Sequence, residues 1–208
     1  MSDKAPSSHL PTLVGDHLAL DFLNSIAAPS GTPIEWISSG RGLVTWMVGA
    51  KAITPADAKS IHSQFSTHDL DQAAREAIAL REWFRDVLKG VKTQEVRVLP
   101  SADINHLNNI LARDASHLRI ENVKDTQLSL SAQRIWHKSS DLLVPLATSM
   151  AELLCKADLS LIQNCSNPPC TMWFYDRTKG HRRRWCSQAV CGNRAKVAAF
   201  RERQKRKV

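Results

Sequence analysis

The clearest pattern of apolar positions lies between residues 69 and 91, where apolar side chains recur every three or four residues. Such a period places them along one stripe of an α-helix. Charged side chains, among them Glu82 and Arg85, lie on the opposite face. The stripe consists of Ala73, Ala77, Leu80, Phe84, Val87 and Val91. The pattern therefore predicts a long amphipathic helix with one face in a hydrophobic core.

Further helices are predicted on both sides of it. Thr54 and Pro55 form a good helix start, because threonine caps a helix and proline suits its first position. Residues 42–50 and a segment that begins at Ser101 also carry a helical period. A last long helix is expected to end near residue 158, where Pro145 either kinks it or lies in its first turn.

Two segments do not follow a helical period. Residues 118–136 resemble two short strands around a polar turn at residues 122–126. Residues 13–26 fit either a short buried strand or the first turns of a helix. The expected fold class is mainly α: an α-rich N-terminal domain with a small β-hairpin, followed by a small C-terminal module. We expect a flexible leader at 1–12, the helical domain at 13–160 and the module at 161–208.

Charge separates this module from the rest of the chain. The 208 residues include 28 Lys and Arg against 20 Asp and Glu, and residues 177–208 hold twelve of the basic residues and one acidic residue. A cationic module on an acidic body points to a polyanion, nucleic acid first and an anionic membrane surface second. The alternative is a solvated basic tail. Because neither a membrane-spanning segment nor a secretory signal is apparent, we expect a cytoplasmic protein without a membrane partner.

Four cysteines of the module form two close pairs. Cys165 and Cys170 are separated by four residues, as are Cys186 and Cys191, and 15 residues separate the pairs. Four thiolates are the ligand set of a structural zinc ion, so one Zn²⁺ per chain is predicted. Free buried cysteines and a redox or iron–sulfur site are the alternatives. His181 is the other candidate ligand, although a lone histidine in a basic turn is expected to face solvent or phosphate.

The spacer between the two pairs predicts a β-hairpin. A strand at residues 172–176 would return, after a turn containing Gly180, along residues 183–185, as in a zinc ribbon or treble clef. Ser187 is the expected N-cap of the following helix, and the basic helix is expected to pack Val197 and Phe200 inward. Cys155, in the preceding segment, is expected to be a packed core thiol.

The residues around the second cysteine pair resemble the CGNR zinc finger, through Trp185-Cys186-Ser187 and the literal Cys-Gly-Asn-Arg at 191–194. Segments 20–24 and 79–82 resemble the ABATE domain that accompanies this finger. The resemblance implies a bacterial regulator of transcription under stress, with the finger binding DNA.

Seven basic residues are the candidate DNA contacts. Residues 182–184 alternate in direction along an extended arm, so Arg183 points away from its two neighbours, and at least one of the three is expected to pair with the acidic body or cap carbonyls. RNA binding, or a zinc-stabilised protein-interaction adaptor, is the alternative function. The candidates are Arg182, Arg183, Arg184, Arg194, Lys196, Arg201 and Arg203.

The helical body is a candidate sensor for a small effector or a protein partner. Asp21 and Asn24 interrupt an apolar segment, and Arg81 borders the buried stripe, where it can pair with Asp21 or bind an anion. The alternative is that they cap helices, anchor loops or form salt bridges. Tryptophans such as Trp136 can line a pocket or pack in the core. No enzyme motif is apparent, so a non-enzyme is expected. A homodimer is considered, although no heptad seam is present.

Overall fold

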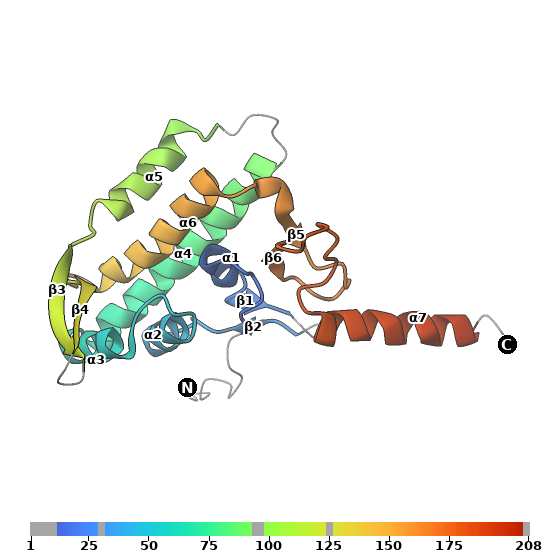
Figure 1. The fold of residues 1–208 in the computed structure, drawn as a ribbon, viewed down its shortest axis with the longest axis horizontal. Helices are drawn as coiled ribbons and strands as arrows, with labels where there is room; N and C mark the ends of the chain where they lie inside the picture. Colours follow the sequence, from blue (N-terminus) through green and yellow to red (C-terminus); the bar gives the residue numbers. More distant parts are fainter. Residues whose placement is uncertain (1–11, 29–31, 93–97, 124–126, 206–208) are drawn as a thin grey trace.

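A computed structural model describes residues 12–28, 32–92, 98–123 and 127–205, and the chain is mainly α-helical there, as predicted (Figure 1). The expected flexible leader, apart from its last residue, lies outside the described residues. The N-terminal elements are α1 Leu18–Leu23, β1 Ile26–Ala27, β2 Ile34–Glu35, α2 Gly40–Gly49, α3 Pro55–Gln64 and α4 Thr67–Lys92. They are followed by α5 Ser101–Leu111, β3 Ser116–Val123, β4 Gln127–Arg134, α6 Leu143–Lys156, β5 Ile162–Asn164, β6 Trp173–Tyr175 and α7 Asn193–Lys205.

The long helix α4 forms the centre of the main hydrophobic core. Its predicted stripe is buried from Ala73 to Val91, with Val87 partly buried. Helices α1, α2 and α6 pack against it, and α5 packs on α6 (Figure 1). The helical period of α4 therefore identified the element around which the body is built.

Local signals fix the starts of two neighbouring helices. Thr54 and Asp57 form a reciprocal capping box at the start of α3, with Pro55 in its first turn. Helix α2 begins at Gly40, two residues before the predicted start. A Cβ atom at Gly40 would lie 2.3 Å from the Cβ of Leu70, so glycine allows α2 to approach α4 closely. Residues 18–23 form helix α1, which resolves the alternative between strand and helix for that segment.

Helix α6 corrects one expectation. Pro145 lies in its first turn, because a 3-10 helix at Ser139–Leu142 precedes it. Cys155 is exposed, so the expectation that it is a packed core thiol was wrong. The reason is helical geometry: Cys155 lies two residues beyond the buried Leu153, roughly 200° around the helix.

The predicted hairpin is formed by β3 and β4, which pair antiparallel over eight residues each. One face is apolar, with Leu118 opposite Ala132 and Ile120 opposite Leu130. These leucine and isoleucine side chains are 65–69% exposed. The hairpin thus carries an apolar surface outside the core.

The cysteine module contains a hairpin whose partner strand differs from the prediction. β6 pairs with β5, which precedes the first cysteine, and residues 183–185 form no strand. The other edge of β6 is occupied, because Tyr175 N donates to Gly15 O at 2.9 Å and Trp173 N donates to the Asn24 side chain at 2.8 Å. The N-terminal segment therefore takes the place that the return arm was expected to fill.

Helix α7 extends away from the body (Figure 1). None of its residues is buried, and Val197 and Phe200 are exposed rather than packed inward as expected. The expectation failed because no described element covers this helix. Within the described ranges, no helix combines the length and the apolar character needed to cross a membrane.

Candidate metal centre

The four cysteines of the two predicted pairs meet in one buried cluster. Cys165 follows β5 directly, and Cys170 lies three residues before β6. Cys186 precedes a π-helical turn at Gln188–Gly192, and Cys191 lies within that turn, whose N-cap is Ser187 as predicted. Their sulfur atoms all lie within 4.8 Å of one another.

The sulfur positions fit a tetrahedral zinc ion. Zn–S bonds of about 2.3 Å in a tetrahedron separate the sulfurs by about 3.8 Å. The Sγ atoms of Cys170 and Cys186 are 3.7 Å apart, and those of Cys186 and Cys191 are 3.6 Å apart. Since the four ligands fill a structural shell, Zn²⁺ here would supply cross-linking and no open position for a substrate.

Proton equilibria of the thiols also call for a cation. Hydrogen bonding from Cys186 lowers the pKa of the Cys170 thiol to about 5. Burial, together with the charge of Cys170, raises the pKa of Cys191 to about 11, and the hydrogen bond with Cys170 and burial raise that of Cys186 further. A divalent ion would stabilise the thiolate forms of these buried cysteines.

Groups around the sulfurs hold them in position. Cys186 N donates to the Cys165 sulfur at 3.4 Å, and Asn167 Nδ2 lies 3.6 Å from the Cys191 sulfur. Asn167 is buried and its backbone carbonyl accepts from Cys170 N at 2.8 Å. Sequence reasoning did not identify the contact of the Asn167 amide with a ligand sulfur. Such contacts orient metal ligands and tune their basicity.

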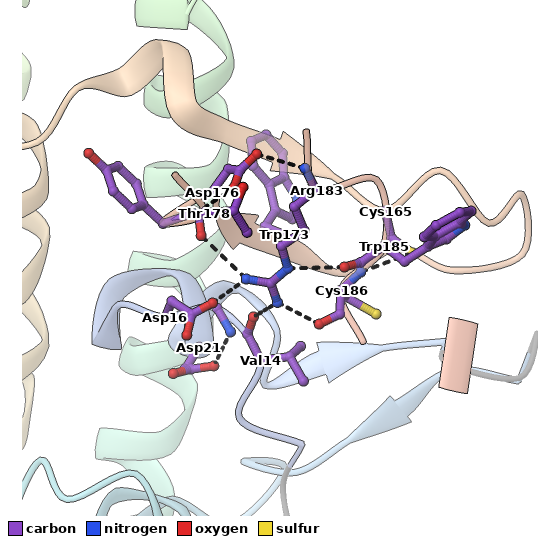
Figure 2. A network of polar contacts seen from close by, with 12 residues as sticks. Val14, Asp16, Asp21, Cys165, Trp173, Asp176, Thr178, Arg183, Trp185 and Cys186 are labelled. Carbon is purple, nitrogen blue, oxygen red and sulfur yellow. Dashed lines mark hydrogen bonds and ion pairs between the residues drawn. The ribbon is translucent and has the colours of Figure 1, made fainter. Parts of the chain in front are cut away.

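Arg183 connects the metal centre to the N-terminal segment (Figure 2). Its Nε donates to Trp185 O at 3.0 Å, and its Nη2 donates to Cys186 O at 2.6 Å and to Val14 O at 3.1 Å. Its Nη1 forms an ion pair with Asp16. The guanidinium is thus engaged on all sides by groups of the chain, in line with the expectation that one arginine of the run caps carbonyls.

The backbone and the ring packing also fix Arg183. Its guanidinium lies 4.3 Å from the ring centre of the buried Phe174. Its backbone N donates to the carboxylate of Asp176 at 2.9 Å, and the same carboxylate accepts from the backbone and the hydroxyl of Thr178. Asp176 was not singled out in the sequence, where only the Asp-x-Thr spacing signals such a turn.

The other candidate DNA contacts lie on the surface. Arg182 and Arg184 are exposed on either side of Arg183, and Arg184 lies 5.3 Å from the ring centre of Trp185. Along α7 the basic residues form two stripes, because positions two apart on a helix differ by roughly 200°. One stripe contains Arg194 and Arg201, and the other contains Lys196 and Arg203. His181 is exposed and lies outside the cluster of four cysteines.

The three sensor candidates are engaged within the body. Asn24 forms two hydrogen bonds with the backbone of Trp173, both of 2.8 Å. Asp21 accepts from Gly15 N at 2.8 Å, and burial raises the pKa of Asp21 to about 6. These bonds hold α1 against β6 and against the preceding loop.

Arg81 does not pair with Asp21, an alternative that we had considered. It is 1% exposed and donates to both carboxylate oxygens of Glu35, at 2.8 and 2.6 Å. It also contacts Glu82 at 2.8 Å and the Ser25 hydroxyl at 2.8 Å. The physical reason is that β2 brings Glu35 to the buried face of α4, so the charge is neutralised there.

Two family models match the chain. The ABATE model, described as "Putative stress-induced transcription regulator", matches residues 16–157, and that of the CGNR zinc finger matches residues 162–204. Neither description names an enzymatic activity. A search of the curated proteins finds no match. The finger match and the sulfur geometry agree on the cofactor, which is one Zn²⁺ ion per chain.

Proposed function

The chain belongs to the ABATE family and carries a CGNR zinc finger, and from this premise we propose that it is a DNA-binding regulator of transcription in the bacterial cytoplasm. In this proposal the zinc finger binds DNA, and the helical body senses an effector or a protein partner during stress. A homodimer stays a prediction.

The observation that carries the proposal is the exposed basic helix α7, which starts at the metal centre. Its described residues include five lysines and arginines and one acidic residue. A helix with this charge matches the phosphate backbone on both sides of a DNA groove, and its diameter suits the major groove. Because Cys191 lies in the turn that leads into α7, zinc binding fixes where the helix begins.

The stripe of Arg194 and Arg201 is the face that we assign to the DNA bases. It is accompanied by Val190 and Val197, which are 44% and 49% exposed and line the same shallow groove. Arginine suits the acceptors of guanine, and apolar side chains suit the thymine methyl group. Arg182 and Arg184 are assigned to phosphates, whereas Arg183 is left out because its donors are already engaged.

The test measures binding of the full zinc-loaded chain to random duplex DNA by fluorescence anisotropy at several salt concentrations. We expect affinity to fall steeply as salt rises. Reversing Arg194 and Arg201 to glutamate should weaken binding at least tenfold, about 1.4 kcal/mol or more, without loss of zinc. Reversing Lys196 and Arg203 tests the opposite stripe and should cost less.

A matched control reverses two exposed cations of the body, Lys59 and Arg75, and should leave affinity close to that of the wild type. Affinity that does not change with salt, or equal losses in the control and α7 variants, would contradict the proposal. Tighter binding to single-stranded RNA than to duplex DNA would instead favour the RNA-binding adaptor.

A further inference from the structure

A cavity of about 500 Å³ lies where the corner between α2 and α3 meets the base of the β3–β4 hairpin. Its size is within the range that holds small organic ligands. It contains none of Asp21, Asn24 and Arg81, but Trp136, which the sequence analysis named as able to line a pocket, belongs to its wall. Its apolar wall consists of Val48, Ala52, Ile53, Pro55, Ala132 and Trp136.

Trp136 belongs to the wall of this cavity and carries an unused hydrogen-bond donor. The residue is 4% exposed, and its buried Nε1 has no partner among the residues that the structure describes. By contrast, Trp83 Nε1 donates to Asp103 at 3.0 Å. A buried donor without an acceptor is costly and therefore rare. The indole of Trp136 thus calls for a ligand with an acceptor oxygen.

Lys51 and Arg134 belong to its wall, and Arg134, which also pairs with Asp114 at 2.8 Å, lies 5.6 Å from the ring centre of Trp136. Asp57 is the acidic residue of the wall, and its carboxylate is already bound by the backbone N and the hydroxyl of Thr54, at 2.9 and 2.7 Å. A carboxylate would satisfy the indole donor, face Lys51 and share Arg134 with Asp114.

An apolar strip continues outward from the cavity. Ala132 and Arg134 lie on the same face of the hairpin as Leu118 and Leu130, because side chains on one strand face alternate ways. Leu118 is directly opposite Ala132, and Leu118 and Leu130 are 69% and 65% exposed. Exposed apolar strips beside a pocket mark binding surfaces. A chain that begins in the cavity can therefore cover them.

We propose that this cavity binds the carboxylate of an alkyl carboxylic acid, with the alkyl chain along Leu118 and Leu130. The inference deepens the sensor role proposed above. It rests on that proposed function only for the effect that ligand binding would have on DNA binding. Binding itself depends on the cavity, the indole donor and the apolar strip.

The test follows the tryptophan indole signals of the ¹⁵N-labelled, zinc-loaded chain by NMR during titration with butyrate, hexanoate, octanoate and decanoate. The signal that disappears in Trp136→Phe identifies Trp136. We expect octanoate to move this signal saturably, and affinity to rise up to about fourfold for each added methylene. Trp136→Phe keeps the aromatic ring and should weaken binding about tenfold.

Controls separate the head from the tail of the ligand. Leu118→Ser should weaken octanoate binding more than butyrate binding, while His117→Ser, on the other hairpin face, should change neither. Octylamine should bind more weakly than octanoate because it carries the wrong charge. Absence of a saturable shift, or affinity that is independent of chain length, would overturn the proposal. No DNA is present in this assay, so a failed DNA-binding test leaves its result unaffected.

Discussion

Replacing Arg183 by methionine should destabilise the finger, although Arg183 belongs to a run of three arginines on a cationic module. Methionine keeps much of the apolar stem and removes the guanidinium. Four backbone carbonyls, those of Val14, Tyr175, Trp185 and Cys186, then lose their donor, and Asp16 loses its ion pair.

The magnitude follows from these contacts. Hydrogen bonds from a charged donor contribute about 1.5–3 kcal/mol each, and water replaces part of that at a side chain that is 20% exposed. We therefore expect a loss of about 3 kcal/mol in the free energy of unfolding. For a chain of this size the corresponding decrease in melting temperature is about 10 °C. Because Arg183 holds the carbonyl of Cys186, zinc affinity should also fall by about tenfold or more.

The assay combines thermal unfolding of the zinc-saturated chain with zinc competition against a chelator. Arg182→Met is the matched control, because Arg182 is the exposed neighbour, and it should stay within about 0.5 kcal/mol of the wild type. At saturating zinc the two variants should differ in the opposite sense in DNA binding. Arg182→Met should lower the slope of DNA affinity against salt concentration by about one, and Arg183→Met should leave this slope unchanged. Equal stability and equal zinc affinity of the two variants would refute the structural role of Arg183.

Three other measurements test the site and the body. Mass spectrometry of the native protein should find one zinc ion per chain, and Cys186→Ser should lose it and loosen the finger, whereas the exposed Cys155→Ser should keep it. Arg81→Met should cost about 3 kcal/mol in urea unfolding, since Glu35 keeps a charge without its partner; a cost below about 1 kcal/mol would argue against the buried pair. The raised pKa of Asp21 means that the folded chain binds more protons than the unfolded chain between about pH 4 and pH 6, so its contribution to stability is present at low pH and is lost as pH rises through about 6. Asp21→Asn should remove this pH dependence in a comparison with wild type, and identical pH profiles would show that Asp21 does not titrate as described.

Local signals in the sequence predicted what depends on neighbours along the chain. The apolar period predicted α4, Thr54 and Pro55 predicted the start of α3, and the spacing of the cysteines predicted the cluster of four sulfurs. In each case the physical cause acts within a few residues or, for the cysteines, through one ion that brings two local pairs together.

Contacts between distant segments could not be predicted in the same way. Asn24 and Trp173 are 149 residues apart, and Arg183 and Asp16 are 167 residues apart. Polarity within an apolar segment marked Asn24 as unusual but could not identify its partner. The inward packing of Val197 and Phe200 failed for the opposite reason, because an amphipathic pattern indicates a partner without showing that the chain supplies one.

Strand β6 connects the finger and the helical body, although the two parts differ in composition. Successive side chains of a strand point to opposite sides. Trp173 therefore packs in the main core, where β6 contacts α1, while Phe174 packs with the four cysteines and Arg183. Asn24, in the body, forms a hydrogen bond with this strand, and Arg183 links the metal centre to residues 14–16. The two cores are therefore connected by one short strand and two sets of polar contacts. Loss of zinc is therefore expected to affect the packing of Phe174 more directly than that of Trp173.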